Sequence, residues 1–198
     1  MKNMSIQYGI VALMLLLMPC AAVQASVIYG AVLTGAAGSP PTASPGTGTT
    51  TVEYDSVLHT MKVDVLFSGL IGTTTAAHIH CCVAFPGHGN AGVATTTPTF
   101  TGFPSGVSSG TYSHLFDLSQ ASSFNASFLA ANGGTTASAE AALAGGLASG
   151  SAYLNIHTDH FPGGEIRGFL TAVPLPTAAW LLGSGLLGLV GVGRCKAV

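Results

Sequence analysis

Two histidines separated by one residue, followed by two adjacent cysteines, form the most chemically specific cluster in the sequence. His78 and His80 flank Ile79 in a segment that is predicted to be a strand, so both imidazole rings project from the same face of a sheet, about 7 Å apart. Cys81 and Cys82 follow directly. Imidazole and thiolate groups together are suitable ligands for copper or zinc. The spacing therefore predicts a candidate metal site.

A third histidine, His157, lies in a second strand-like segment. Polar and apolar side chains alternate over residues 153–157, which predicts a strand with one apolar face and one polar face that carries His157. Residues 161–164 then reverse the chain, because proline presets φ and glycine accepts the positive φ of tight turns. The return strand is predicted to begin at Glu165. His157 completes the metal site only where the sheet brings this hairpin beside the strand of the first two histidines.

Each of these groups also has a structural interpretation that needs no metal. Histidines on a strand are commonly hydrogen-bonded parts of the fold. In an oxidising compartment, Cys81 and Cys82 could instead pair with each other as a vicinal disulfide. Glu165 and Arg167 lie two residues apart on the return strand and share a face, which predicts an ion pair that anchors the hairpin.

Motifs of nucleophilic catalysis are missing from the sequence. It contains no Gly-x-Ser-x-Gly segment, no phosphate-binding loop with its lysine, and no Cys-His pair in a recognised context. The sequence favours a non-catalytic protein over an enzyme.

Short strands joined by turns are predicted to position the candidate ligands. Over residues 59–67, apolar side chains at alternate positions face one way while Lys62 and Asp64 face the other. Residues 119–131 and 135–147 instead show the three-and-four spacing of helices. These patterns predict a mainly β fold: an antiparallel β-sandwich, immunoglobulin-like or superoxide dismutase-like, with one or two short helices before the last hairpin. The predicted strands before the hairpin are 26–34, 51–53, 59–67, 73–82, 93–97 and 111–118, and residues 35–50 are predicted to be a loop.

The composition restricts the class of protein. Only 6% of the 198 residues are charged and 48% are hydrophobic, which argues against a disordered charged chain and against a cytosolic helical protein. Between residues 26 and 173, two cationic side chains oppose seven acidic ones, a formal charge of −5. Nucleic acid is therefore excluded as a partner, because no basic surface can form.

Both ends of the chain resemble targeting segments and bound a central domain at residues 26–172. Residues 1–25 have an early cation, an apolar run and small residues at the end, the pattern of a signal peptide cleaved after Ala25. Lipidation at Cys20 is an alternative, although Pro19 is unusual before a lipidated cysteine. Residues 178–193 form an apolar run with Trp180 near its start and a basic tip after its end, which predicts a transmembrane helix; the alternative is a buried core helix.

The last segment, residues 173–198, resembles a PEP-CTERM-type sorting signal of the Val-Pro-Leu-Pro variety. The resemblance rests on a short motif followed by a single apolar span and a basic end. It implies a Gram-negative host that makes exopolysaccharide, transient anchoring in the inner membrane through the C-terminal helix, and processing by an exosortase-type enzyme. It also implies export to the cell surface or beyond, with envelope or exopolysaccharide components as partners. The motif residues are Val173, Pro174, Leu175 and Pro176.

The middle of the chain resembles the CHRD domain first described in chordin. The resemblance is carried by residues 77–80 (Ala-His-Ile-His), 91–94 (Ala-Gly-Val-Ala), 152–158 (Ala-Tyr-Leu-Asn-Ile-His-Thr) and 161–168 (Phe-Pro-Gly-Gly-Glu-Ile-Arg-Gly). It implies an extracellular β-sandwich of about this length, whose bacterial members have no established activity. Copper-zinc superoxide dismutase is similar in placing His-x-His on a β-sandwich, but no other motif of that enzyme is present.

Two functional hypotheses follow from the sequence. The first is an exported, non-catalytic CHRD module of the cell envelope or extracellular matrix, sorted through its C-terminal anchor. The alternative is a redox protein that binds copper or zinc through His78, His80 and His157, with Cys81 and Cys82 as further candidate ligands.

Overall fold

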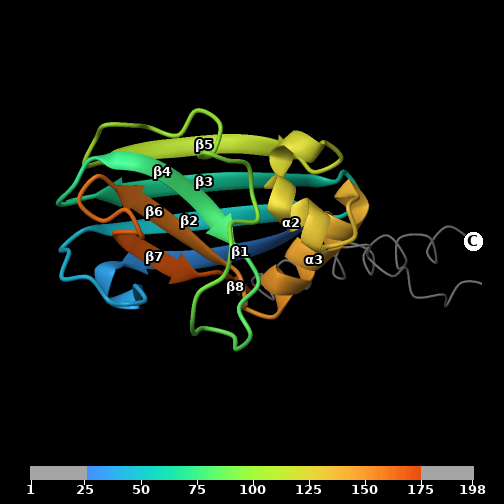
Figure 1. The fold of residues 1–198 in the computed structure, drawn as a ribbon, viewed down its shortest axis with the longest axis horizontal. Coiled ribbons are helices and arrows are strands. Elements are labelled where there is room, and N and C mark those ends of the chain that lie inside the picture. Colours follow the sequence, from blue (N-terminus) through green and yellow to red (C-terminus); the bar gives the residue numbers. More distant parts are fainter. Residues whose placement is uncertain (1–25, 175–198) are drawn as a thin grey trace, which may run out of the picture.

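One antiparallel sheet, with helices at one end, makes up the part of the chain that the structure describes (Figure 1). The computed structural model of the protein describes residues 26–174. The predictions for the signal peptide, for Leu175 and Pro176, and for the C-terminal helix and basic tip therefore lie outside the described residues. The strand order is β4-β6-β7-β1-β2-β3-β5, and β8 pairs with β1. The strands are β1 (Ser26–Thr34), β2 (Thr47–Asp55), β3 (Thr60–Ser68), β4 (Thr74–His80), β5 (Gly110–Asp117), β6 (Tyr153–Thr158), β7 (Ile166–Phe169) and β8 (Thr171–Ala172).

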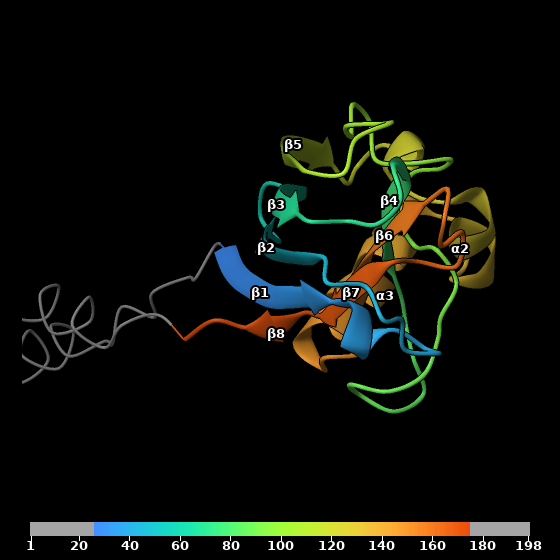
Figure 2. The same cartoon turned by 90° about the vertical axis from the view of Figure 1, so that its left-hand side faces the viewer.

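The sheet curls back on itself (Figure 2), and the buried apolar side chains of residues 26–174 form one hydrophobic core. Alternate residues of β3, such as Val63 and Phe67, are buried while Lys62 and Leu66 are exposed, as the period of two requires. Ile79 of β4 and Ile156 of β6 belong to the same core. The prediction of a mainly β, antiparallel fold is confirmed. Its sandwich-like layers, however, are two halves of one continuous curled sheet.

Two predicted strands differ from those observed. β2 begins at Thr47, within the segment predicted to be a loop. Residues 47–51 pair with the last half of β1, and the β-branched side chains of the four threonines among them suit a pleated surface. The predicted strand 93–97 makes only isolated bridges, from Val93 to His80 and from Thr95 to Phe124. This segment follows the free edge of β4 without forming a ladder.

The predicted helices are confirmed in kind, although the first is much shorter than expected. Residues 119–131 contain a 3-10 turn, η3 (Ala121–Ser123), and then α2 (Ala126–Ala131); a second 3-10 turn, η2 (Gly35–Ala37), follows β1. The longer helix α3 (Thr136–Ala148) begins at a capping box formed by Thr135 and Ser138. Its Ala139, Leu143 and Leu147, at intervals of four, are buried against the core. Within residues 26–174, the structure contains no helix with the length and apolarity needed to cross a membrane.

The first and last strands of the described domain are neighbours. Tyr29 of β1 pairs with Ala172 of β8, and the amide of Val173 donates to the carbonyl of Ile28 at 2.8 Å. The start of β1 and the end of β8 therefore lie at the same side of the molecule (Figure 2). Val173 and Pro174, the first half of the predicted sorting motif, are exposed.

Candidate metal centre

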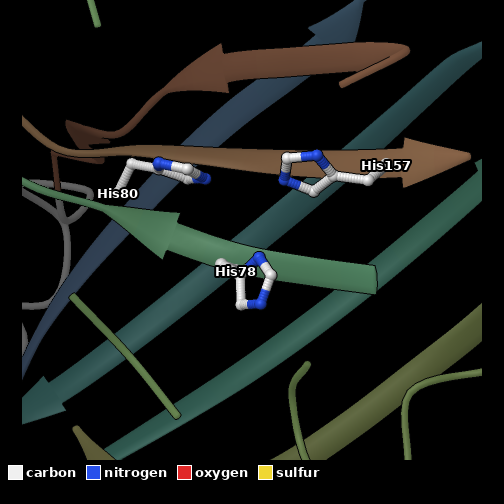
Figure 3. A group of neighbouring side chains, drawn as sticks. All are labelled: His78, His80 and His157. Atoms are coloured by element: carbon white, nitrogen blue, oxygen red, sulfur yellow. The ribbon is translucent and has the colours of Figure 1, made fainter. Parts of the chain in front are cut away.

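The structure brings together the three histidines that the sequence singled out. One ring nitrogen from each of His78, His80 and His157 lies within 4.8 Å of the other two. β4 pairs directly with β6, with His78 opposite Asn155, so His157 lies one step further along β6 on the same face of the sheet (Figure 3). The opposite faces of these strands carry Ile79 and Ile156 into the core. The local alternation of residues therefore directs all three imidazoles outward.

This outer face is itself covered, which the sequence did not predict. Segments 90–98 and 162–164 pass over β4 and β6, and their hydrogen bonds to the side chains of these strands bury much of the expected polar face. Asn155 is only 4% exposed and His78 only 6%. The histidines are consequently held in a shielded environment beneath loops.

Each imidazole is oriented by one backbone carbonyl. His78 Nε2 lies 2.6 Å from the carbonyl oxygen of Pro98, His80 Nδ1 2.9 Å from that of Ala91, and His157 Nδ1 2.8 Å from that of Pro162. Because a carbonyl can only accept a hydrogen bond, each of these ring nitrogens carries the proton. In a neutral ring, the opposite nitrogen is then an unprotonated acceptor.

These unprotonated nitrogens converge on one another. His78 Nδ1 and His80 Nε2 are buried and have no hydrogen-bond partner among the described residues. His157 Nε2 has one long contact, 3.4 Å from the amide nitrogen of Asn155. Buried acceptors without donors are unfavourable, and three lone pairs directed at one point repel each other. A cation at that point satisfies all three, and ring N–H groups bound to carbonyls are the usual support for histidine ligands.

The surroundings keep the rings neutral. Burial is the main cause that lowers the pKa of His78, to about 4, and the nearby His157 and His80 lower it further, against the opposing effect of the Pro98 carbonyl. Burial also lowers the pKa values of His80 and His157. At neutral pH a metal ion therefore need not displace protons from these nitrogens.

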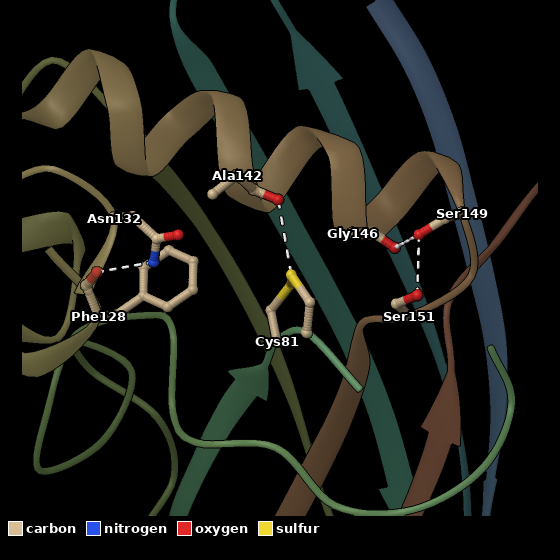
Figure 4. Close-up of a disulfide and its surroundings, with 8 residues drawn as sticks. Cys81, Phe128, Asn132, Ala142, Gly146, Ser149 and Ser151 are labelled. Atoms are coloured by element: carbon tan, nitrogen blue, oxygen red, sulfur yellow. Dashed lines mark hydrogen bonds between the residues drawn. A yellow bond between two sulfur atoms is a disulfide. The ribbon is translucent and has the colours of Figure 1, made fainter. Parts of the chain in front are cut away.

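The cysteines do not join the cluster. Cys81 and Cys82 form a disulfide with each other, the alternative that the sequence left open. Their sulfur atoms face α3, where Cys82 Sγ lies 3.6 Å from the carbonyl oxygen of Ala142 (Figure 4). A disulfide has no thiolate to offer a metal, and Cys81 turns away from the face that carries His80. The predicted sulfur ligands must therefore be corrected: the candidate donor set consists of three imidazoles.

The predicted ion pair between Glu165 and Arg167 is wrong. Glu165 is fully buried, and its carboxylate accepts hydrogen bonds from the hydroxyls of Ser44 and Thr158, at 2.6 and 2.8 Å, and from two backbone amides, those of residues 71 and 72. Arg167 donates instead to the carbonyl of Ala37 and to the side-chain oxygen of Asn90. The two side chains therefore bind different segments: Glu165 holds residues 44, 71 and 72 to the hairpin, and Arg167 holds residues 37 and 90.

Sequence reasoning missed the groups that orient the histidines. The carbonyls of Ala91, Pro98 and Pro162 belong to loops, and backbone carbonyls are present at every residue. No side-chain pattern could have distinguished them. The turn-forming prolines at 98 and 162 were the only available signal that these loops have fixed shapes.

Comparison with known proteins identifies one family. The model of the CHRD domain family matches residues 29–170. Comparisons with curated proteins and with solved structures gave no match.

Proposed function

The chain belongs to the CHRD domain family, and on this premise we propose that it is an exported, non-catalytic module that binds a copper or zinc ion through His78, His80 and His157. The family suggests an extracellular type of module without enzymatic activity. The histidine cluster adds a specific binding capacity to that general role.

One observation carries the metal proposal: three unprotonated imidazole nitrogens converge, two of them buried without a partner. Within residues 26–174, this is the one group of three or more histidine, cysteine, aspartate or glutamate side chains close enough to hold an ion. Imidazole ligands without sulfur or carboxylate suit Zn²⁺ and Cu²⁺, while hard cations such as Ca²⁺ and Mg²⁺ prefer oxygen. Three protein ligands also leave a coordination position for water or another ligand.

Metal stoichiometry tests this proposal. The purified full chain is incubated with Zn²⁺ or Cu²⁺, desalted, and analysed by mass spectrometry for metal content. We expect about one ion per chain for the wild type, and its loss in the double variant His78→Ala/His80→Ala. His88→Ala, which changes an exposed loop histidine outside the cluster, is the matched control and should keep the ion. Wild-type protein without metal, or a double variant that retains it, would contradict the proposal.

Export and sorting form the second part of the proposal. Support comes from the signal-like segment 1–25, from the sorting-like segment 173–198, and from the exposure of Val173 and Pro174 immediately after β8. An exosortase-type enzyme is the proposed processing partner, and the cell surface or extracellular matrix is the destination.

Cell fractionation with and without residues 173–198 tests the sorting proposal. The full chain should pass through an inner-membrane stage to the cell surface or medium, whereas the truncated chain should be exported without membrane anchoring. A truncated protein that stays in the inner membrane would show that this segment is not the anchor.

A further inference from the structure

A pocket with a volume of about 480 Å³ opens beside the histidine cluster. Its walls come from four places: the turn that follows η2, the end of β4 at His80, the loop around Asn90, and the β6–β7 hairpin. His80 and Asn155 line it on the side of the cluster, and Arg167 lines it from β7. A single pocket therefore adjoins both a candidate metal ligand and a cation.

Arg167 is a buried cation without an ionic partner. The residue is 6% exposed, and no carboxylate among the described residues lies within ion-pair distance of its side chain. Glu165 also lines the pocket, but its carboxylate is engaged by four other donors. The remaining titratable groups in the lining, besides His80, are the phenol of the buried Tyr153 and the exposed His160.

The guanidinium group is held in a fixed orientation and has donors to spare. Its Nε and Nη1 donate to Ala37 and Asn90, while Nη2 has no hydrogen-bond partner among residues 26–174. The guanidinium carbon lies 4.7 Å from the centre of the Tyr153 ring and 5.6 Å from that of Phe169. Stacking on aromatic rings and two anchored nitrogens fix the plane of this group before any ligand arrives.

A buried charge that lacks a counter-charge is expensive to maintain, and an anion in the pocket offsets that cost. A carboxylate suits the free N–H groups of Nη2, because hydrogen bonds between a guanidinium group and a carboxylate are charge-assisted and stronger than neutral ones. We propose that this pocket binds a small molecule that bears a carboxylate, with Arg167 as its anchor.

The remaining lining supports a ligand about as large as a monosaccharide or a short organic acid. Pro40, Phe161 and Pro162 offer apolar contacts, and Asn90 and the backbone of Gly163 offer polar ones. The carboxylate could belong to a free organic acid or to a uronate unit of a polysaccharide, and both share the group that Arg167 recognises. Binding does not depend on the metal, although an ion at the histidines would add positive charge to the same pocket.

Calorimetric titration of the metal-free full chain tests the inference separately from the metal proposal. The probes are sodium succinate, sodium glucuronate and, as the neutral match to the second, glucose. Wild-type protein should bind at least one carboxylate saturably and should not bind glucose. Binding of succinate alone indicates a free acid, and binding of glucuronate alone indicates a sugar acid. Failure to bind either carboxylate would overturn the inference.

Variants identify the anchor. Arg167→Met should weaken carboxylate binding roughly ten- to hundredfold, as expected for the loss of hydrogen bonds to a charged group. Lys62→Met, which removes an exposed cation paired with Asp64 outside the pocket, should leave it unchanged.

A second pair of variants keeps the test valid where Arg167→Met fails to fold. His160 is exposed at the pocket, so His160→Glu should weaken binding and His160→Lys should strengthen it through charge alone. Carboxylate affinity that is the same in the wild type and in every folded variant of Arg167 and His160 would overturn the proposal.

Discussion

The three histidines differ from ordinary buried polar residues in that one nitrogen of His78 and one of His80 have no hydrogen-bond partner among the described residues, and that of His157 has only a long contact with Asn155. Carbonyls of Ala91, Pro98 and Pro162 satisfy one side of each ring, and the other sides face one another. A fold that needed these rings only for structure would supply a donor to the second nitrogen. These nitrogens are the basis of the proposal that a metal ion binds here.

Single substitutions of the three histidines should separate binding from folding. His78→Ala, His80→Ala and His157→Ala should each weaken Zn²⁺ affinity by at least about tenfold, measured by competition with a chromogenic chelator. Without metal, truncating His78 or His80 to alanine should lower the free energy of unfolding in urea by less than truncating an apolar residue of equal burial. The reason is that the substitution removes a buried acceptor that has no partner. Unchanged affinity in all three variants would exclude them as ligands.

Glu165 should make stability sensitive to acid. Burial alone would raise its pKa, but hydrogen bonds from Ser44, Ile71, Thr158 and Gly72 outweigh it, so its pKa lies below the usual 4.5. A lowered pKa means that the stabilisation is complete above the unfolded value and is lost as the pH falls through the folded value. Glu165→Gln should therefore cost about 1–3 kcal/mol at pH 7 and progressively less below about pH 4. Urea unfolding of the wild type and the variant at pH 7 and pH 3.5 measures this cost at each pH. An equal cost at the two pH values would contradict the prediction.

At the scale of elements, α3 contacts both β2 and the segment that follows β4. Glu140 of α3 accepts hydrogen bonds from the hydroxyl of Tyr54 on β2 and from the ring of His59, each at 2.9 Å. One face of the helix also packs against the Cys81–Cys82 disulfide, which directly follows the His80 end of β4. The helix thus braces the segment that carries two of the three candidate ligands.

Two neighbouring glycines of α3 give a matched test of this packing. A methyl group at Gly146 would lie 2.2 Å from Cys81 Sγ and 2.6 Å from Cys82 Sγ, whereas one at Gly145 would meet nothing within 4 Å. Gly146→Ala should destabilise the protein by about 1–3 kcal/mol through overpacking. Gly145→Ala should stabilise it by roughly 0.5–1 kcal/mol, because alanine is the better helix former. Thermal unfolding, monitored by circular dichroism, measures the stability change of each variant. Equal changes in the two variants would show that the disulfide does not pack closely on α3.

For the molecule as a whole, the candidate site joins segments far apart in the sequence. Its ligands come from β4 and β6, and the carbonyls that orient them come from loops before and after those strands. An ion there cross-links the β4 edge of the sheet to the closing hairpin. The pairing of β8 with β1 leaves both ends of the domain on one side. The proposed C-terminal anchor would therefore attach the domain from that side, and the histidine cluster would remain covered by the loops at residues 90–98 and 162–164.

Metal should accordingly stabilise the entire fold. A ligand that binds only the folded state at a free concentration one hundred times its Kd adds about 2.7 kcal/mol. We expect Zn²⁺ to raise the Tm of the wild-type chain and to leave that of the triple variant His78→Ala/His80→Ala/His157→Ala unchanged, in differential scanning calorimetry. An equal rise in both proteins would indicate binding elsewhere.

The sequence by itself determined which way residues face within each element. The period of two in β3 and β6 separated core-facing from outward-facing residues, the His-x-His spacing placed two imidazoles on one face, and the helical spacing of residues 135–147 predicted α3. These properties depend on neighbours along the chain, so local patterns encode them. The family resemblance, carried by the same segments, was confirmed over residues 29–170.

Only the tertiary structure decided what those faces meet. The strand order that places β4 against β6, the loop carbonyls that free one nitrogen of each histidine, and the separate partners of Glu165 and Arg167 all join distant parts of the chain. So does the packing that turns the disulfide toward α3 and away from the histidines. Periodicity specifies the direction of a side chain but not its partner, because the partner is set by how the sheet curls and where its loops cross.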